Sequence, residues 1–196
     1  MEPLQSPDVR RFDKWGSTYD RSVFQRFFFM PIHARMLALM SADGLTRKPG
    51  RVVDVGCGTG RLLRAAALRW PEAELVGVDP APMMISEATR LNPVASFVLG
   101  SAESLQLPDG SVDFVLSSLS FHHWSDQAKG LHEIARVLRP GGAFCLADHN
   151  FAVARLSGEK VRSRAELRSM LAGAGLGVLV QKGGGLPFLT LTLAGK

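Results

Sequence analysis

The feature that most constrains the fold of this chain is a run of alternating glycines that follows a β-branched stretch. Residues 52 to 60 read Val-Val-Asp-Val-Gly-Cys-Gly-Thr-Gly, and an amphipathic stretch begins at Arg61. This order predicts a strand, a tight turn and a helix, because glycine permits positive φ and lets a ligand lie against bare backbone. The spacing is G-x-G-x-G rather than the G-x-G-x-x-G of dinucleotide-binding folds. Asp54 would repel a pyrophosphate and attract an ammonium or sulfonium group. The turn therefore favours a cationic ligand, the alternative being an ordinary glycine-rich turn.

Length and composition favour a single domain that works in a reducing compartment. A chain of 196 residues is long enough to bury one sizeable core. No apolar run is long enough to span a bilayer, and the first residues lack the pattern of a secretory signal. The two cysteines, Cys57 and Cys145, do not make a disulfide framework. We therefore expect a cytoplasmic protein.

The positive charge is concentrated at the two ends of the chain. The net charge is +5, of which residues 1–48 carry about +3, residues 49–148 about −3 and residues 149–196 about +5. The basic ends fit an acidic substrate, an anionic surface or a merely solvated face. No cluster of Lys and Arg with interleaved aromatics indicates nucleic acid. The sequence does not indicate an oligomeric state.

The pattern of apolar residues predicts strands that alternate with helices. Strands are expected at Arg51–Val55, Glu74–Val78, Ala95–Leu99, Val112–Ser117, Ala143–Ala147, Leu176–Gln181 and Phe188–Leu193. Helices are expected at Asp20–Met40, Gly60–Arg69, Pro82–Arg90, Ser125–Val137 and Arg164–Ala172, with Pro31 starting a second helix or kinking the first.

This alternation predicts an α/β fold with a doubly wound, mostly parallel, seven-stranded sheet. The last two strands lack a helix between them, so they must form a hairpin that adds one C-terminal antiparallel strand. Such a sheet binds its ligand at the carboxyl ends of its strands. We expect residues 1–48 to form a helical lid or substrate cap, and residues 49–196 to form the ligand-binding core.

Four ordered motifs carry a resemblance to a known family. They are Val52–Gly60, Val76–Pro80, Gly100–Glu103 followed by Leu107-Pro108, and Leu138–Gly142. Together they resemble the class I S-adenosylmethionine-dependent methyltransferases, especially the subgroup of ubiquinone and menaquinone biosynthesis methyltransferases. The resemblance covers nearly the whole chain. It implies a Rossmann-like methyltransferase fold, S-adenosylmethionine as cofactor, and methyl transfer to a small-molecule acceptor by in-line displacement.

The resemblance also implies which residues hold the cofactor. Asp79 would accept hydrogen bonds from both ribose hydroxyls, and Pro80 and Met84 would flank the adenine ring. Ser101 stands where the family often has Asp, so its contact with the adenine amino group is expected to be weaker. The full expected set is Tyr19, Asp54, Gly56, Cys57, Gly58, Gly60, Asp79, Pro80, Met84, Ser101, Ala102, Glu103, Ser118 and Leu119.

Methyl transfer asks little acid–base chemistry of the protein, because a sulfonium is already a good leaving group and positioning supplies most of the rate. If the acceptor must lose a proton, the candidate bases are His122, His123 and His149. Tyr19 is expected in a lid over the sulfonium end, or else as a packing residue. The structural alternative for the histidine pair is that one ring caps the helix that starts near Ser125.

A metal ion is not expected. Asp148-His149-Asn150 offers possible ligands, but the preceding strand ends in Ser117 and Ser118 rather than in a carboxylate. His33 and His132 fall in predicted helices and are expected to be packing or surface residues.

Three other functions are alternatives to methyl transfer. A short-chain oxidoreductase on the same fold needs a Tyr and a Lys one helical turn apart, whereas Tyr19 is followed by Val23 at that spacing. A cofactor-binding module without catalysis stays open. So does a membrane-surface enzyme acting on a quinone or lipid, although it is not favoured; its helix would carry Phe24, Phe27, Phe28 and Phe29 beside Arg21, Arg26 and Arg35. The alternative is that these phenylalanines bury against the sheet and line the substrate pocket.

Overall fold

The computed structural model describes residues 23–41, 48–150, 160–185 and 188–196, and its centre is a seven-stranded sheet. The strands are β1 (Arg51–Val55), β2 (Glu74–Asp79), β3 (Ser96–Leu99), β4 (Val112–Ser118), β5 (Leu138–His149), β6 (Gly177–Gly183) and β7 (Leu189–Gly195). They lie in the order β3-β2-β1-β4-β5-β7-β6. Strands β3 to β5 pair in parallel, and β7 is antiparallel to both of its neighbours. The predicted fold class is confirmed, with β6 rather than β7 at the edge.

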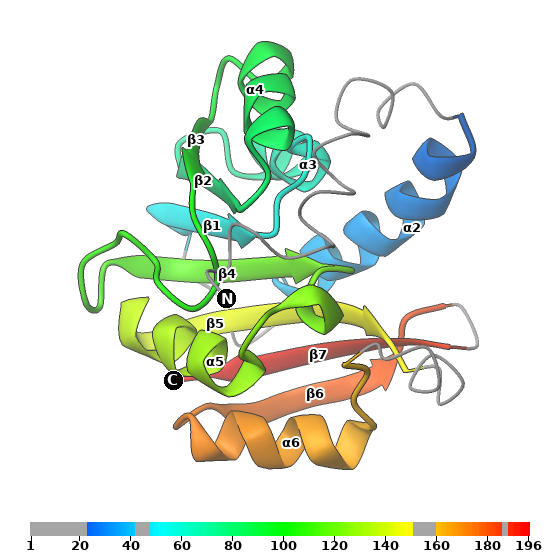
Figure 1. Ribbon diagram of the computed structural model, residues 1–196, viewed down its shortest axis with the longest axis vertical. Coiled ribbons are helices and arrows are strands. Elements are labelled where there is room, and N and C mark those ends of the chain that lie inside the picture. The colour runs from blue at the N-terminus through cyan, green and yellow to red at the C-terminus, as the bar shows by residue number, and fades with distance from the viewer. Residues whose placement is uncertain (1–22, 42–47, 151–159, 186–187) are drawn as a thin grey trace.

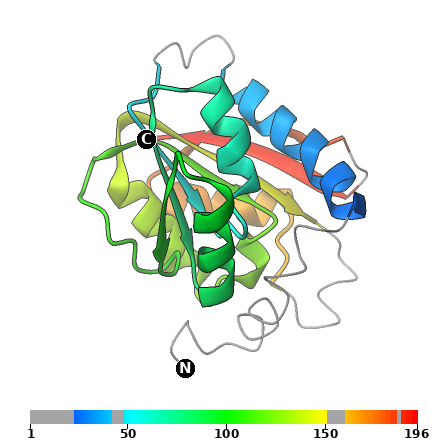
Figure 2. The same cartoon turned by 90° about the horizontal axis from the view of Figure 1, so that it is seen from above.

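Helices cover both faces of the sheet. They are α2 (Val23–Leu39), α3 (Arg61–Arg69), α4 (Pro82–Leu91), α5 (Gln127–Val137) and α6 (Arg164–Gly173), with a 3₁₀ turn η2 (Phe121–His123). Figures 1 and 2 show α2 and α3 on one face and α5 and α6 on the other. None of the helices in the described ranges has the length and hydropathy needed to cross a membrane.

The pleat of β4 separates two apolar layers. Val115 packs with the cluster under α5 and α6, whereas its neighbours Phe114 and Leu116 pack with the cluster under α2 and α3. Successive side chains of a strand point to opposite faces, so a strand buried on both sides needs an almost continuous apolar run. This explains why the central strands of the sequence lack polar alternation.

Pro31 does not start a second helix, contrary to one of the two expectations. It lies inside α2, which runs as one helix from Val23 to Leu39. A proline removes one helical hydrogen bond, but burial of an amphipathic face can outweigh that loss. Here Ile32 and Met36 are almost fully buried in the core directly after the proline.

Two other boundaries differ, one because of a distant segment and one because of a local helix cap. β5 extends over Leu138–His149 rather than Ala143–Ala147, since the glycine turn pairs with the last residue of the chain. Gly141 N donates to Lys196 O at 3.0 Å, and Lys196 N donates to Gly142 O at 3.1 Å. α5 begins at Gln127 rather than Ser125, because the Asp126 side chain accepts from Lys129 N and caps the helix.

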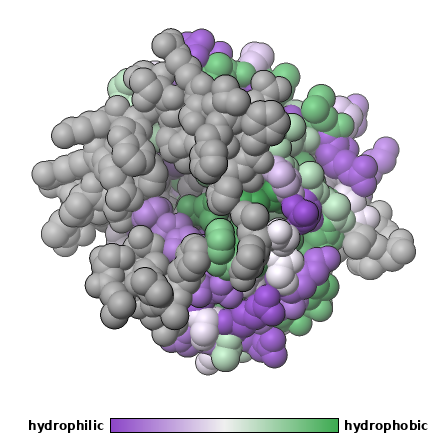
Figure 3. All heavy atoms as spheres, turned by 90° about the vertical axis from the view of Figure 1, so that its right-hand side faces the viewer, coloured by the Kyte–Doolittle hydropathy of each residue, from purple (hydrophilic) through white to green (hydrophobic). Residues whose placement is uncertain are grey.

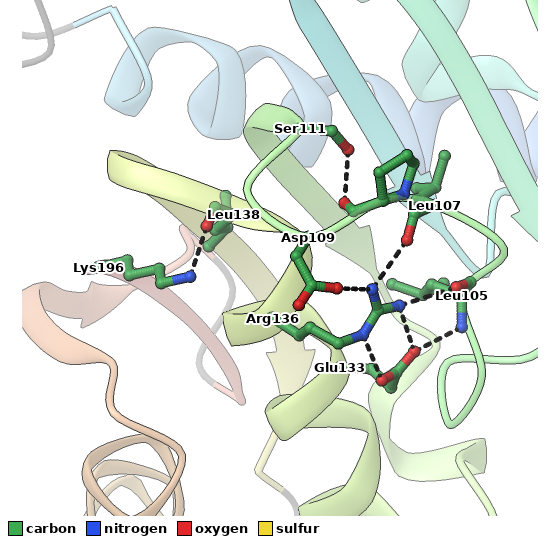
Figure 4. Close-up of polar contacts among 9 residues, drawn as sticks. Leu105, Leu107, Asp109, Ser111, Glu133, Arg136, Leu138 and Lys196 are labelled. Carbon is green, nitrogen blue, oxygen red and sulfur yellow. Dashed lines mark hydrogen bonds and ion pairs between the residues drawn. The ribbon is translucent and has the colours of Figure 1, made fainter.

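A guanidinium network ties the loop after β3 to α5 (Figure 4). Arg136 donates to both carboxylate oxygens of Glu133, to Asp109 Oδ1, and to the carbonyl oxygens of Leu105 and Leu107 at 2.6–2.9 Å. The hydrogen bonds from Arg136 hold the pKa of Glu133 below its ordinary value. The contribution of this pair to stability is therefore present at neutral pH and is lost as the pH falls through that lowered pKa. The network fixes the loop that begins at Gly100, one of the motifs predicted to contact the cofactor.

Candidate cofactor and acceptor site

The carboxyl ends of β1, β2 and β4 open into one crevice of about 860 Å³, counting the space at its mouth. Figure 3 looks onto this edge of the sheet and shows apolar atoms gathered near the centre of the face. Most of the residues predicted to hold a cofactor line the crevice: Gly56, Gly58, Asp79, Pro80, Met84, Ser101, Ala102, Glu103, Ser118 and Leu119. Residues from three of the four sequence motifs, together with the end of β4, are thus brought together, as the topology requires.

The remaining predicted residues lie elsewhere. Asp54 and Cys57 line a hollow of about 380 Å³ that shares its glycine wall with the crevice, and we call this the Asp54 hollow. Gly60 lines neither space. Its φ is 73° and an added Cβ would meet the ring of Phe97 at 2.8 Å, so Gly60 allows α3 to start close against the sheet. Tyr19 lies outside the described residues.

The glycine loop is held against the end of β2 by its own backbone. Gly56 N and Cys57 N both donate to Val78 O, at 2.8 and 3.1 Å. An added Cβ at Gly56 would lie 2.3 Å from Ser120 Oγ, whereas at Gly58 it would meet nothing within 4 Å. Gly56 is therefore required by the packing of the protein itself. Gly58, with φ 51°, leaves bare backbone facing both spaces.

Asp79 is the anchor between the loop and the crevice. Its Oδ2 accepts from Gly58 N at 2.8 Å and its Oδ1 from Ala81 N at 2.9 Å. The carboxylate is buried, and this burial raises its pKa to about 6 although both backbone donors oppose the shift. Each carboxylate oxygen can accept more than one hydrogen bond, so each retains capacity for a ligand donor. Two adjacent hydroxyls, as on a ribose, match this arrangement.

Asp54 is a buried carboxyl that is incompletely satisfied by the protein. It is only 2% exposed, and its Oδ1 has no hydrogen-bond partner. Burial, together with the nearby Asp79 carboxylate, raises its pKa to about 8. Burial lowers the pKa of His33 in the same hollow to about 4, so that imidazole is neutral at pH 7. An unsatisfied buried carboxyl in a lined hollow is what a site for a cationic ligand group requires.

Several lining residues were missed by the sequence reasoning. Phe29 and His33 reach the Asp54 hollow from α2, and Arg61 reaches it from the first turn of α3. Arg61 had a local signal, since it directly follows the glycine loop. His33 had none, because only the packing of α2 against α3 and β5 brings it to the loop. Phe29 was not missed, since it is one of the phenylalanines expected to line the substrate pocket.

The loop after β3 supplies the other wall of the crevice. Met84 is 2% exposed and lines it from α4. Glu103 is also buried, and its Oε1 accepts from Asp126 N at 3.0 Å. Glu103 thus connects this loop to the start of α5, so its position is set by the protein before any ligand binds. An apolar slot with fixed polar groups at its edge suits a flat heterocycle.

The three candidate histidines lie in one row. His122 is largely buried, and its ring centroid is 3.9 Å from that of His123 and 4.2 Å from that of His149. His123 lines the crevice, whereas His149 lies on the far side of His122. Neither His122 nor His123 caps α5, so the structural alternative for the pair is wrong; Asp126 is the cap.

Asp148 orients the middle ring. Its Oδ1 lies 2.7 Å from His122 Nδ1 and accepts from His149 N at 2.8 Å, while its Oδ2 accepts from His122 N at 3.0 Å. A carboxylate only accepts, so we assign the ring proton of His122 to Nδ1, which leaves Nε2 as an acceptor. Ligand atoms of His122, Asp148 and His149 all lie within 4.8 Å of one another, a spacing that a metal ion would also fit. Asp148 accepts from three N–H groups, which favours a hydrogen-bonded carboxylate–imidazole pair over a metal ligand. The absence of a metal remains a prediction.

Comparisons with known proteins agree with this geometry. Residues 53–146 match the family model of the methyltransferase domain. An uncharacterized methyltransferase of Mycobacterium tuberculosis, Rv3342, is 44% identical over 92 residues, which cover 47% of this chain and 37% of that protein. The demethylmenaquinone methyltransferase of Thermus thermophilus is 38% identical over 102 residues, which cover 50% of this chain and 46% of that protein. The chain thus spans less than half the length of these curated relatives.

Among solved structures, the complex between the Haloferax volcanii Trm112 methyltransferase activator and a putative methyltransferase contains a similar chain. Its TM-score is 0.79 at 26% identity, and the match covers 94% of this chain and 96% of that one. The residues present also fit the cofactor of this family, since the open backbone at Gly58 and the two acids stand at the ends of adjacent strands. Fold, crevice and similarities agree, and residues 53–146 resemble the methyltransferase domains of the class I S-adenosylmethionine-dependent family.

Proposed function

We propose that this protein transfers a methyl group to a small-molecule acceptor. The observation that carries the proposal is the pairing of Asp79 and Asp54, two buried carboxyls on either side of a bare glycine backbone. When bound, S-adenosylmethionine supplies a methyl group on a sulfonium, which is open to in-line displacement. The protein has then to hold, orient and desolvate the two reactants.

In this proposal, the crevice holds the adenosine part and the Asp54 hollow holds the amino-acid part. Asp79 accepts from the ribose hydroxyls, and Pro80 and Met84 flank the adenine ring. Ser101, Ala102 and Glu103 contact the edge of the base. The Asp54 carboxyl lies near the cationic end, where an ammonium or sulfonium favours its ionised form.

A general base, where the acceptor needs one, is supplied by the histidine row. His123 lines the crevice, and we propose that it faces the acceptor. His122 supports it from behind with its Nδ1 held by Asp148. This arrangement takes a proton from a phenol or activated carbon acceptor, and such bases contribute on the order of 10²–10⁴-fold in rate. Because one relative acts on demethylmenaquinone, quinols belong in the acceptor screen.

Residues 1–48 are proposed to act as a lid, and residues 49–196 as the core. Support comes from α2, whose Phe29 lines both the crevice and the Asp54 hollow. The later part of α2 is anchored in the core through Ile32 and Met36. We expect deletion of residues 1–22 to leave the cooperative unfolding transition in place and to reduce turnover strongly. Normal turnover by the truncated protein would contradict the lid.

The cellular site is also a proposal. Both cysteines are free and buried. Burial raises the pKa of Cys145 to about 12 and that of Cys57 well above its ordinary value, so neither thiol is reactive. Two unreactive, unpaired thiols support a reducing compartment such as the cytoplasm.

The first prediction tests cofactor binding at Asp79. Asp79→Ala should weaken binding of S-adenosylhomocysteine by roughly 10- to 100-fold, since hydrogen bonds to a charged acceptor contribute about 1.5–3 kcal/mol. Titration calorimetry measures this change, with the exposed Glu72→Gln as the matched control. NAD should not bind measurably. An unchanged dissociation constant in Asp79→Ala would place the ribose elsewhere, and comparable affinity for NAD would refute the proposed cofactor.

The second prediction follows from the pKa of Asp54. A carboxyl whose pKa rises from 3.8 to about 8 on folding binds a proton more tightly in the folded state. The free energy of unfolding therefore falls as the pH rises between these values. Asp54→Asn removes that loss, so its stability relative to the parent should increase from pH 5 to pH 8 in urea unfolding.

The same variant should bind S-adenosylhomocysteine more weakly than the parent, because the amide cannot neutralise the ligand's ammonium. Gain of stability with loss of affinity is the diagnostic pair of results. If Asp54→Asn is destabilised equally at both pH values, the carboxyl is not held in its neutral form by burial.

The third prediction concerns the histidines. His123→Gln should lower turnover of a phenolic acceptor by about 10²-fold or more while leaving S-adenosylhomocysteine affinity unchanged, because the amide cannot take a proton. His122→Gln should have a smaller effect, since it acts through its neighbour. The exposed His132→Gln is the control. Full turnover by both His122→Gln and His123→Gln would leave positioning, or His149, as the only contribution.

A further inference from the structure

A separate, narrow hollow lies at the carboxyl end of β5, against the apolar layer under α5 and α6; its empty space is about 300 Å³ when the part open to solvent is counted. We call it the arginine hollow. Its polar wall consists of Asp148, His149, Asn150, Arg162, Arg164 and Thr190. None of these residues lines the crevice or the Asp54 hollow, so the proposed cofactor site makes no use of them.

The arginine hollow carries a net positive charge. Within the described ranges, neither Arg162 nor Arg164 forms an ion pair; they donate to Gln127 Oε1 at 2.6 Å and to Thr190 Oγ1 at 3.4 Å. Asp148 already accepts three N–H groups from His122 and His149, as described above. Guanidinium groups without a carboxylate partner are suited to bind an anion from solution.

Arg162 is held in place before any ligand arrives. Gln127 is only 3% exposed, and its Nε2 donates to Phe121 O at 3.0 Å and to Lys160 O at 2.8 Å. This fixes Gln127 Oε1, which receives the Nε–H of Arg162 and leaves the terminal N–H groups of that guanidinium for another acceptor. The Arg162 side chain is thus ordered when the protein folds, so less conformational entropy is lost when an anion binds to it.

The other side of the hollow is built in a similar way. Thr190 Oγ1 lies 3.2 Å from Asn150 Nδ2 and also receives the weaker contact from Arg164. Thr190 is buried, on β7 where it pairs with β5. The wall therefore combines a fixed amide, a fixed hydroxyl and two guanidinium groups around one opening.

The histidine row lies between the arginine hollow and the crevice. His149 lines the hollow, His123 lines the crevice, and His122 contacts both rings. We infer that the methyl acceptor is an anion whose carboxylate or phosphate binds Arg162 and Arg164, while its accepting atom lies beside His123. This inference rests on the proposed methyl transfer. It assigns two of the basic residues of the segment 149–196, Arg162 and Arg164, to acceptor binding.

Anion binding can be tested without cofactor or turnover. The ligand-free protein is titrated at constant ionic strength with inorganic phosphate and, separately, with acetate, and the imidazole proton signals are followed by NMR. We expect a saturable shift of His149, with the exposed His132 unchanged. Tighter binding of phosphate would assign a phosphate ester, and tighter binding of acetate a carboxylate. A His149 signal that does not respond to either anion overturns the inference.

Variants identify the binding groups. Arg162→Gln and Arg164→Gln should each weaken the titrated anion by about tenfold or more, as expected for loss of a charge-assisted contact. Arg162→Lys should be intermediate, because it keeps the charge but not the fork. Arg168→Gln, exposed on α6 and bonded to Gln181, is the matched control and should bind like the parent. Thermal unfolding midpoints report whether each variant is folded. Equal affinity in all folded variants would overturn the assignment.

Turnover provides the second readout. With phenol, 4-hydroxybenzoate and 4-hydroxyphenyl phosphate as acceptors, Arg164→Gln should raise KM for the anionic acceptors about tenfold and leave KM for phenol unchanged. Equal losses for charged and neutral acceptors would exclude selection of an anion by the hollow. If the parent protein does not bind S-adenosylhomocysteine, the proposed methyl transfer fails, whereas the phosphate and acetate titrations still decide the arginine hollow.

Discussion

The site depends on the contact between the glycine loop after β1 and the end of β2. Parallel pairing sets Val55 opposite Val78, so the two strands end at the same level. The loop then folds back, and its N–H groups bond to Val78 O and to the Asp79 carboxylate. Only a chain that accepts positive φ and has no Cβ can pass so close to the neighbouring strand. The position of Asp79, the open backbone at Gly58 and the shape of the crevice all follow from this contact.

Two buried carboxyl groups, those of Asp148 and Asp54, differ in how completely the protein satisfies them with hydrogen bonds. Asp148 accepts three N–H donors and thereby holds the 3₁₀ turn η2 against the end of β5. Asp54 lies at the end of β1 with one oxygen unbonded, and its pKa is raised to about 8. A buried polar group costs free energy unless it is hydrogen-bonded. Asp148 therefore stabilises the structure. Ionised Asp54 reduces stability in the absence of a ligand, and a bound cation favours its ionised form.

This difference separates the two ends of the proposed reaction site. On the cofactor side, the carboxyls of Asp54 and Asp79 and the bare backbone of the glycine loop are suited to a positively charged group. On the acceptor side, Asp148 is fully engaged, so the outward charge there comes from Arg162 and Arg164. The histidine row lies between the two regions, with the tautomer of His122 set by Asp148. The apolar clusters on both faces of the sheet stabilise this arrangement, since the central strands are buried on each side.

The sequence by itself determined the fold class, the succession of strands and helices along the chain, and most of the crevice. These depend on local features: apolar runs, glycines at a fixed spacing, and acids placed directly after strands such as Asp79. Parallel topology then brings all strand ends to one edge. Tertiary structure alone decided the state of each group there. Burial in the packed structure raises the pKa of Asp54. Three contacts there join residues that are 21 to 35 positions apart in the sequence: His33 with Asp54 in one hollow, His122 with Asp148, and Gln127 with Arg162. Such contacts leave no periodic trace in a sequence, because desolvation and hydrogen-bond geometry exist only once the layers have packed.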